Sequence, residues 1–250
     1  MRCRLRAFAQ IAVMKNIENL SVIWPLVSRK LDTGTPQGKR IMIKTIATVA
    51  LVLTTSLVHA GDMLQGDATA GEAKAVTCGA CHGADGNSVV PSFPKLAGLG
   101  DKYLLKQMKD IRDGRRVVAA MAGQVDNMSD QDLADIAAFY DEKTRTPELA
   151  NADLMELGRK VYMSGIMERK VAACSGCHSP SGKGNGPGGF PGLAGQHPDY
   201  IAAQLKMFRT GYEDPAGRTN DSDSKIMRTT AFELSDKEIE AVASYAAGLR

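Results

Sequence analysis

The chain has 250 residues, of which 44% are hydrophobic, 24% charged and only 5% aromatic. Its formal net charge of +3 originates in the first 60 residues, which hold nine of the 31 Lys and Arg but two of the 28 Asp and Glu. The other 190 residues carry 22 basic and 26 acidic side chains, a net of −4, and so lack the basic footprint of a nucleic-acid-binding protein.

The first 60 residues are typical of a targeting region. Three basic residues precede an apolar run over residues 46–58, and the small side chain of Ala60 follows. This layout predicts a secretory signal over residues 42–60, cleaved after Ala60, and therefore a periplasmic protein. A membrane anchor would need about 20 apolar residues, which this run does not reach. Residues 1–41 fit no part of such a signal, so Met42 is an alternative start, and we expect no role for the upstream piece in the exported protein.

The exported part repeats itself. The repeated segments are CGACH (78–82) and CSGCH (174–178), FPKLAG (93–98) and FPGLAG (190–195), YLLKQMKDIRDG (103–114) and YIAAQLKMFRTG (200–211), and SDQDLADIAAFY (129–140) and SDKEIEAVASYA (235–246). The offsets are 96, 97, 97 and 106, so the second copy holds about nine extra residues before its last helix. We expect two tandem domains, at residues 61–145 and 146–250.

Apolar spacing within each copy is helical. Apolar side chains recur at intervals of three and four along residues 104–111 and 133–140, and no period-two alternation is sustained. Ser129 and Ser235 stand where capping boxes would begin the last helix of each copy. We therefore predict an all-α protein with three to five short helices per domain. The long Gly/Pro loops leave little apolar surface for an ordinary core, so another apolar body is expected to fill each centre.

Two Cys-x-x-Cys-His pentapeptides hold all four cysteines that remain after residue 60. A redox disulfide or half of a zinc site would explain the cysteines but not the histidine in both copies, and structural disulfides stay open in an oxidising compartment. Covalent haem explains every residue, because two thiols on one turn can bond the porphyrin vinyl groups while the histidine binds iron. The sequence thus predicts two haem c groups, held by Cys78, Cys81 and His82, and by Cys174, Cys177 and His178.

A second axial ligand is expected to be methionine. The only other histidine after residue 60, His197, occurs in one copy, and a structural role is the better interpretation for it. Met121 and Met227 each lie eight residues before the capping serine of their copy, and we predict that both bind iron. Core packing is the better interpretation for three methionines without an equivalent partner in the other copy: Met108, Met128 and Met207.

These motifs together resemble the dihaem cytochrome c4 family, which has two class I cytochrome c domains in tandem. The resemblance rests on CGACHGADGNS, FPKLAG, YLLKQ, SDQDLADIAAFY, CSGCH, GGFPGLAGQHPDY and IMR. It implies that Pro94 and Pro191 supply the carbonyls that accept the histidine Nδ1 protons. It also implies electron transfer in the periplasm between a respiratory donor complex and a terminal oxidase, and no enzymatic activity.

Two alternatives remain at this stage. One is the haem electron-transfer subunit of a periplasmic dehydrogenase; the other, less favoured, is a dihaem peroxidase, which would need an open or bis-histidine iron. Peripheral membrane association stays open. We further expect the haem edges to face each other, with Tyr103 and Tyr200 near the propionates, and the N-terminal haem to have the lower potential.

Overall fold

The computed structural model describes residues 64–250. Within this range the regular elements are all helices, and β-structure is limited to two isolated bridges, Ile166 with Val171 and Asn185 with Phe190. The predicted all-α class is confirmed. The predicted signal at residues 42–60 and its cleavage after Ala60 lie outside the described residues.

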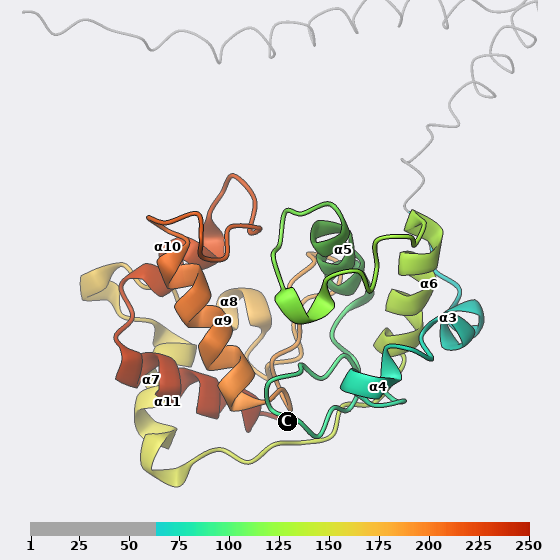
Figure 1. Ribbon diagram of the computed structural model, residues 1–250. Helices are drawn as coiled ribbons and strands as arrows, with labels where there is room; N and C mark the ends of the chain where they lie inside the picture. The colour runs from blue at the N-terminus through green and yellow to red at the C-terminus, as the bar shows by residue number, and fades with distance from the viewer. Residues whose placement is uncertain (1–63) are drawn as a thin grey trace, which may run out of the picture. The chain divides into compact units, whose positions relative to one another are not determined.

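The first repeat is built on four α-helices (Figure 1). They are α3 (Ala68–Lys74), α4 (Gly79–His82), α5 (Asp101–Arg112) and α6 (Asp130–Asp141), with the 3-10 helix η2 (Ala119–Met121) between α5 and α6. Helices α3 and α5 both pack against α6. Its buried residues include Leu133, Ile136 and Tyr140, three of the residues expected on the inner face from their spacing.

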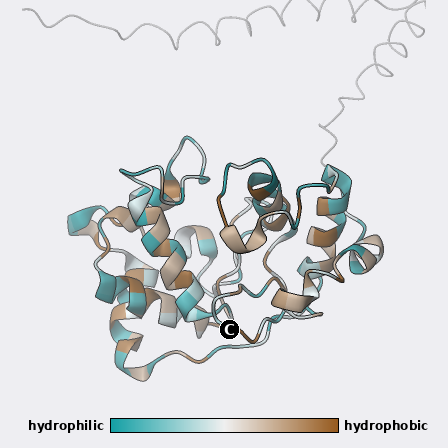
Figure 2. Ribbon diagram, in the orientation of Figure 1, coloured by the Kyte–Doolittle hydropathy of each residue, from teal (hydrophilic) through white to brown (hydrophobic). Residues whose placement is uncertain are grey.

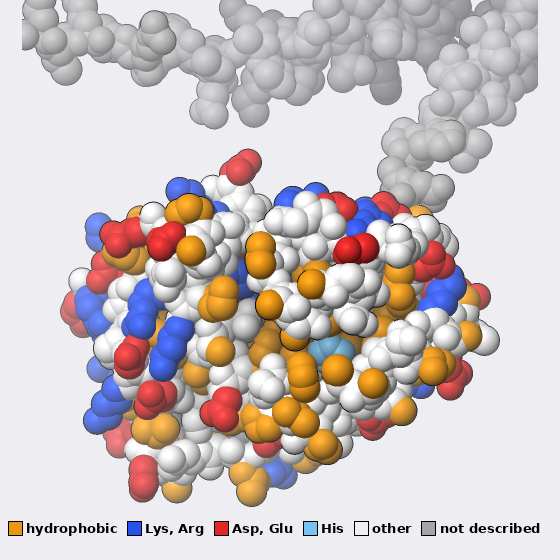
Figure 3. Space-filling model, viewed as in Figure 1, with side chains coloured by type: hydrophobic (Ala, Val, Ile, Leu, Met, Phe, Trp, Pro, Cys, Tyr) orange, Lys and Arg blue, Asp and Glu red, His pale blue; other side chains and the backbone are white. Residues whose placement is uncertain are grey.

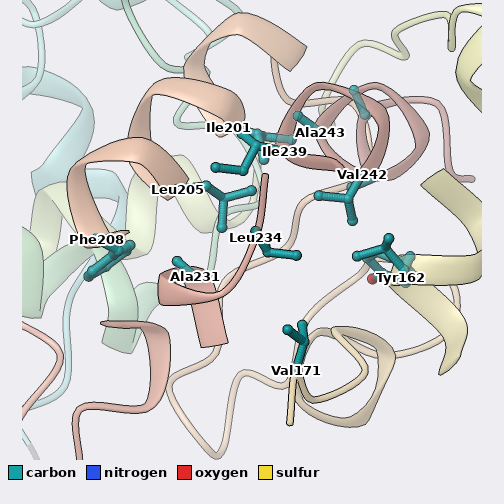
Figure 4. Packing of buried hydrophobic residues seen from close by; sticks show 13 residues of the cluster. Tyr162, Val171, Ile201, Leu205, Phe208, Ala231, Leu234, Ile239, Val242 and Ala243 are labelled. Atoms are coloured by element: carbon teal, nitrogen blue, oxygen red, sulfur yellow. The ribbon is translucent and has the colours of Figure 1, made fainter. Parts of the chain in front are cut away.

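The second repeat follows the same plan with five α-helices in the described chain. They are α7 (Met155–Ser164), α8 (Ser175–His178), α9 (Pro198–Thr210), α10 (Ile226–Phe232) and α11 (Asp236–Ala247), with 3-10 helices η3 (Ala152–Leu154) and η4 (Met167–Arg169). Helix α11 packs against α7 and α9. Figure 4 shows Ile201 of α9 beside Ile239 of α11, and Phe208 of α9 nearer to Ala231 of α10.

Capping boxes begin both last helices, as the sequence predicted. Ser129 Oγ accepts from the Asp132 backbone N–H, and the Asp132 carboxylate accepts from the Ser129 N–H at 3.0 Å. Ser235 and Glu238 make the same reciprocal pair at the start of α11. These bonds satisfy backbone donors that would otherwise be unpaired at a helix N-terminus.

The helices carry mixed hydrophilic and hydrophobic residues along their length (Figure 2). Leu104 of α5 and Phe139 of α6 are buried in the first core, whereas Lys106 of α5 and Gln131 of α6 are exposed. None of the helices in residues 64–250 is long and apolar enough to cross a membrane.

Two glycines allow the N-terminal helix of each repeat to lie against its last helix. A Cβ on Gly71 of α3 would lie 2.0 Å from the carbonyl oxygen of Asp135, and one on Gly158 of α7 would lie 2.3 Å from that of Ala241. Real Cβ atoms do not approach backbone this closely, so any side chain would push the helices apart. Glycine is therefore required at both crossings.

One group of contacts between the repeats lies in the loops after each pentapeptide. Gln196 exchanges two hydrogen bonds with the backbone of Lys95, at 2.9 and 2.8 Å. His197, the histidine that occurs in one copy only, is buried, and its Nε2–H donates to the Ser88 carbonyl at 2.9 Å. Its Nδ1 lies 3.0 Å from Oε1 of Glu148. A structural role for His197 is supported, although the residue is buried rather than in an exposed loop.

Replacing Gly158 by valine should destabilise the protein by about 1–3 kcal/mol, the usual cost of overpacking. The reason is the clash with the Ala241 carbonyl. Chemical denaturation of the haem-loaded chain, followed by far-UV circular dichroism, measures this cost. Gly186→Val is the matched control, since nothing lies within 4 Å of a Cβ built at Gly186. Equal midpoints for the two variants would contradict the close-packing argument.

Candidate functional site

The first pentapeptide forms a single helical turn. Cys78 is the N-cap of α4, and the helix carries Cys81 and His82. The backbone N–H of His82 donates to the Cys78 carbonyl at 3.0 Å, which closes the turn. The two sulfur atoms and the imidazole are thus presented from one short element, as the predicted site requires.

The second pentapeptide has the same construction. Cys174 is the N-cap of α8, which carries Cys177 and His178, and the His178 N–H donates to the Cys174 carbonyl at 2.9 Å. His82 and His178 are both buried, with exposed fractions of 7% and 6%. The structure therefore brings together both predicted Cys-Cys-His sets.

Each histidine is oriented by a proline carbonyl. Nδ1 of His82 lies 2.9 Å from the Pro94 oxygen, and Nδ1 of His178 lies 2.8 Å from the Pro191 oxygen. Because a carbonyl only accepts, Nδ1 must carry the proton, and Nε2 keeps the lone pair that a metal needs. Burial lowers the pKa of both histidines, and the bond to the carbonyl offsets this only in part, so the neutral form is favoured.

No disulfide joins the four cysteines of the described chain. Burial raises the pKa of Cys78, and it raises the pKa of Cys174 to about 11. A redox-active Cys-x-x-Cys pair instead lowers a thiol pKa to generate a thiolate. The environment of these cysteines therefore differs from that of a thiol–disulfide site.

A large cavity adjoins the first pentapeptide. It has a volume of about 1570 Å³, and its lining includes Cys78, Cys81, His82 and Met121. Figure 3 shows hydrophobic side chains gathered around a recessed histidine on this face of the molecule. The expected second axial residue thus lines the same cavity as the histidine.

The second pentapeptide lines a tighter cavity of about 130 Å³. Cys174, Cys177, His178 and Met227 all contribute to its wall. Met227 also packs against the buried cluster of the second repeat. Both methionines selected by the repeat therefore share a cavity with the histidine of their own copy.

Other methionines reach the first cavity as well. Met108 of α5 and Met207 of α9 line it together with Met121. Met108 packs in part against the first core, and Met207 is 39% exposed. Met128 packs against the same core as Met108 and is absent from the lining of either cavity.

The two cavities share part of their walls. Tyr103 and Tyr200, the predicted polar aromatic pair, line both, as do Gln204 and Arg218. Two glutamines near these tyrosines, Gln107 and Gln204, were not among the residues predicted from the sequence. Gln107 and Gln204 each follow their tyrosine by four residues, so retention of the Tyr-x-x-x-Gln spacing in both copies was the available signal.

The cytochrome c family model matches this chain twice, at residues 68–141 and 155–249. The chain belongs to the cytochrome c family. Cytochrome c4 of Pseudomonas aeruginosa is 52% identical over 204 residues, covering 80% of this chain and 97% of that protein. The crystal structure of reduced recombinant cytochrome c4 from Pseudomonas stutzeri aligns with a TM-score of 0.71 at 48% identity, covering 74% of this chain and 100% of that one.

A more distant relative is named for its redox partner. The thiosulfate dehydrogenase electron acceptor of Stutzerimonas stutzeri is 36% identical over 180 residues, covering 70% of this chain and 80% of that protein. The comparisons confirm the predicted tandem arrangement of the cytochrome c4 type and the presence of two covalently bound haem c groups.

The residues of this cytochrome fit such a group. Each histidine keeps Nε2 free, and the first cavity is enclosed largely by apolar side chains. The buried hydroxyl of Tyr140 lines this cavity and has no hydrogen-bond partner among the described residues. A bound group that carries acceptor atoms would satisfy this hydroxyl.

Proposed function

We propose that this chain is a periplasmic electron carrier that passes single electrons between components of a respiratory chain, toward a terminal oxidase. The observation that carries the proposal is the duplicated site, in which a buried histidine and the methionine at the equivalent repeat position line the same cavity in each repeat. A haem with protein ligands on both faces leaves no position for a substrate, so the chain is a carrier and not itself an enzyme.

Each residue of the site has a distinct task. Cys78 and Cys81 in the first domain, and Cys174 and Cys177 in the second, would hold haem through thioether bonds. When bound, each haem takes up and releases one electron. The Pro94 carbonyl keeps His82 in the tautomer that can bind iron.

The opposite face of each site is assigned to methionine. Met121 would close the site of His82, and Met227 would close that of His178. A thioether is a soft, neutral ligand that raises the potential of a haem relative to a second histidine.

The domains that carry these sets are assigned to residues 61–145 and 146–250, after removal of residues 1–60 with cleavage after Ala60.

The haem subunit of a periplasmic dehydrogenase is the second candidate. Similarity to the thiosulfate dehydrogenase electron acceptor of Stutzerimonas stutzeri favours it over a peroxidase. Both functions use the same ligand sets, and they differ only in the protein that donates the electrons.

Met121→Ala and Met227→Ala should each admit carbon monoxide at one haem per chain and lower the potential of that haem. The cause is loss of the thioether sulfur from one face of the iron. Carbon monoxide difference spectra of the reduced protein measure the binding. Met108→Ala and Met207→Ala are matched controls, because both residues line the first cavity and neither variant is expected to bind the gas. Binding to either control variant and not to Met121→Ala would reassign the ligand.

The protein that donates electrons to this chain can be identified by stopped-flow mixing of the oxidised full-length protein with candidate donors. Membranes with quinol-oxidising activity should reduce both haems, and membranes with terminal oxidase activity should reoxidise them. Fast reduction only by a soluble dehydrogenase with its substrate would support the second candidate. Turnover of peroxide by the reduced protein would contradict the assignment as a carrier.

The N-terminal haem should have the lower potential. Residues 61–150 hold 10 basic and 14 acidic side chains, whereas residues 151–250 hold 12 of each. Greater negative charge stabilises the ferric state, and exposed charges are screened over ~10 Å, so we expect a difference of about 1 kcal/mol, roughly 40 mV for one electron. Redox titration followed by NMR of the Met121 and Met227 methyl groups assigns each midpoint. The reverse order would show that the local surroundings of the iron outweigh net charge.

A further inference from the structure

Two arginines cross between the repeats. Nη2 of Arg116, in the first repeat, donates to Tyr200 Oη and to Gln204 Oε1 at 3.1 Å each. Both acceptors belong to α9 of the second repeat. Nη1 of Arg116 donates to Gln107 Oε1 in its own repeat at 2.9 Å.

Arg218 of the second repeat makes the reciprocal contacts. Its Nη2 donates to Tyr103 Oη at 3.1 Å and to Gln107 Oε1 at 2.8 Å, both on α5. Its Nη1 donates to Gln204 Oε1 in its own repeat at 2.7 Å. Each arginine thus bonds the tyrosine and glutamine of the opposite helix and the glutamine of its own. We call Arg116 and Arg218 the arginine pair.

The arginine pair is positively charged and has neutral hydrogen-bond acceptors. No carboxylate of residues 64–250 forms an ion pair with either guanidinium. The network reaches the Asp110 carboxylate through Asn220 Nδ2 at 2.7 Å, but Asp110 is already paired with Lys106 and Arg115. Arg218 is only 6% exposed. A buried charge of this kind is weakly screened and acts on its surroundings more strongly than a surface charge.

The pair lies between the two haem sites. Arg116 lines the cavity that contains His82, and Arg218 lines both that cavity and the one that contains His178. The charge of the pair affects a neighbour: burial alone would raise the pKa of Tyr103, but Arg218 and Arg116, with a smaller effect of Lys106, lower it below its ordinary value.

We propose that the arginine pair raises the reduction potentials of both haems, as a positively charged element that the two sites share. Oxidation adds a positive charge to each iron, and two nearby cations disfavour that state. Because the hydrogen bonds of each arginine extend into both repeats, loss of either one alters both sites. The inference rests on two haems per chain but is independent of the donor and acceptor proteins.

The test is spectroelectrochemical titration of the full-length dihaem protein carrying Arg116→Gln or Arg218→Gln. Each substitution should lower both midpoints, by about one order of magnitude in the equilibrium constant for reduction, or about 59 mV for a one-electron couple. Arg115→Gln is the matched control. Arg115 adjoins Arg116 in sequence and also lines the first cavity. Its side chain is 54% exposed and its charge is paired with Asp110 and Asp113, so both midpoints should change little.

Two further variants separate charge from structure. Arg116→Lys keeps the charge and should keep both midpoints close to those of the unmodified protein. Gln107→Glu places a carboxylate of nearly the same shape against both guanidiniums and should lower both midpoints without removing either arginine. This variant also provides the test if a glutamine variant fails to accumulate with two haems. The proposal is overturned if only one midpoint moves, if neither moves, or if Arg116→Lys shifts them as far as Arg116→Gln.

Discussion

Both haem sites depend on the hydrogen bond from a histidine Nδ1 to a proline carbonyl. The bond fixes the ring and its tautomer, and it can form only if the loop with the proline returns to the pentapeptide. Backbone hydrogen bonds set that return: the Leu96 N–H donates to the Gly86 carbonyl at 2.7 Å, and the Leu193 N–H donates to the Gly182 carbonyl at the same distance. Gly86 and Gly182 have φ values of +76° and +71°, which favour glycine.

The linker between the domains ties these two loops together. Arg145 is partly buried there, and its Nε donates to the Ala97 carbonyl at 2.7 Å. Its Nη1 donates to the carbonyls of Gly192 and Ala194, at 2.9 and 3.1 Å. Burial lowers the pKa of Arg145 to about 10, in line with the cost of placing a cation among carbonyl groups alone. Arg145 thus connects the loop that orients His82 to the loop that orients His178.

Much of each domain could be predicted from the sequence, because the relevant signals are local. The pentapeptides, the helical spacing before Tyr140 and the capping serines at 129 and 235 each act within a few residues. The contacts between domains were not predictable in this way. Arg116 and Arg218 are 102 residues apart, an offset that matches none of the four repeated segments, because the extra residues of the second copy interrupt the alignment there.

A second group of interdomain contacts comes from positions where the copies have diverged. FPKLAGLG in the first copy is FPGLAGQH in the second, so Lys95, Gln196 and His197 have no equivalent partner. These are the residues that make the one-sided contacts: Lys95 and Gln196 pair with each other, and Nζ of Lys95 and Nδ1 of His197 both lie within 3.0 Å of Glu148 Oε1.

The interface therefore combines two kinds of contact with different consequences. Residues retained in both copies, such as Tyr103 and Tyr200, are related by the repeat and face both cavities, so they cannot distinguish one site from the other. Diverged residues can make the two sites differ, because each lies in a single copy with no counterpart. Lys95, a buried cation one residue after Pro94, whose carbonyl accepts the His82 proton, has glycine as its equivalent in the second copy. Electrostatic differences between the sites must therefore arise from such diverged positions and from net charge, while the retained residues set what the two sites have in common.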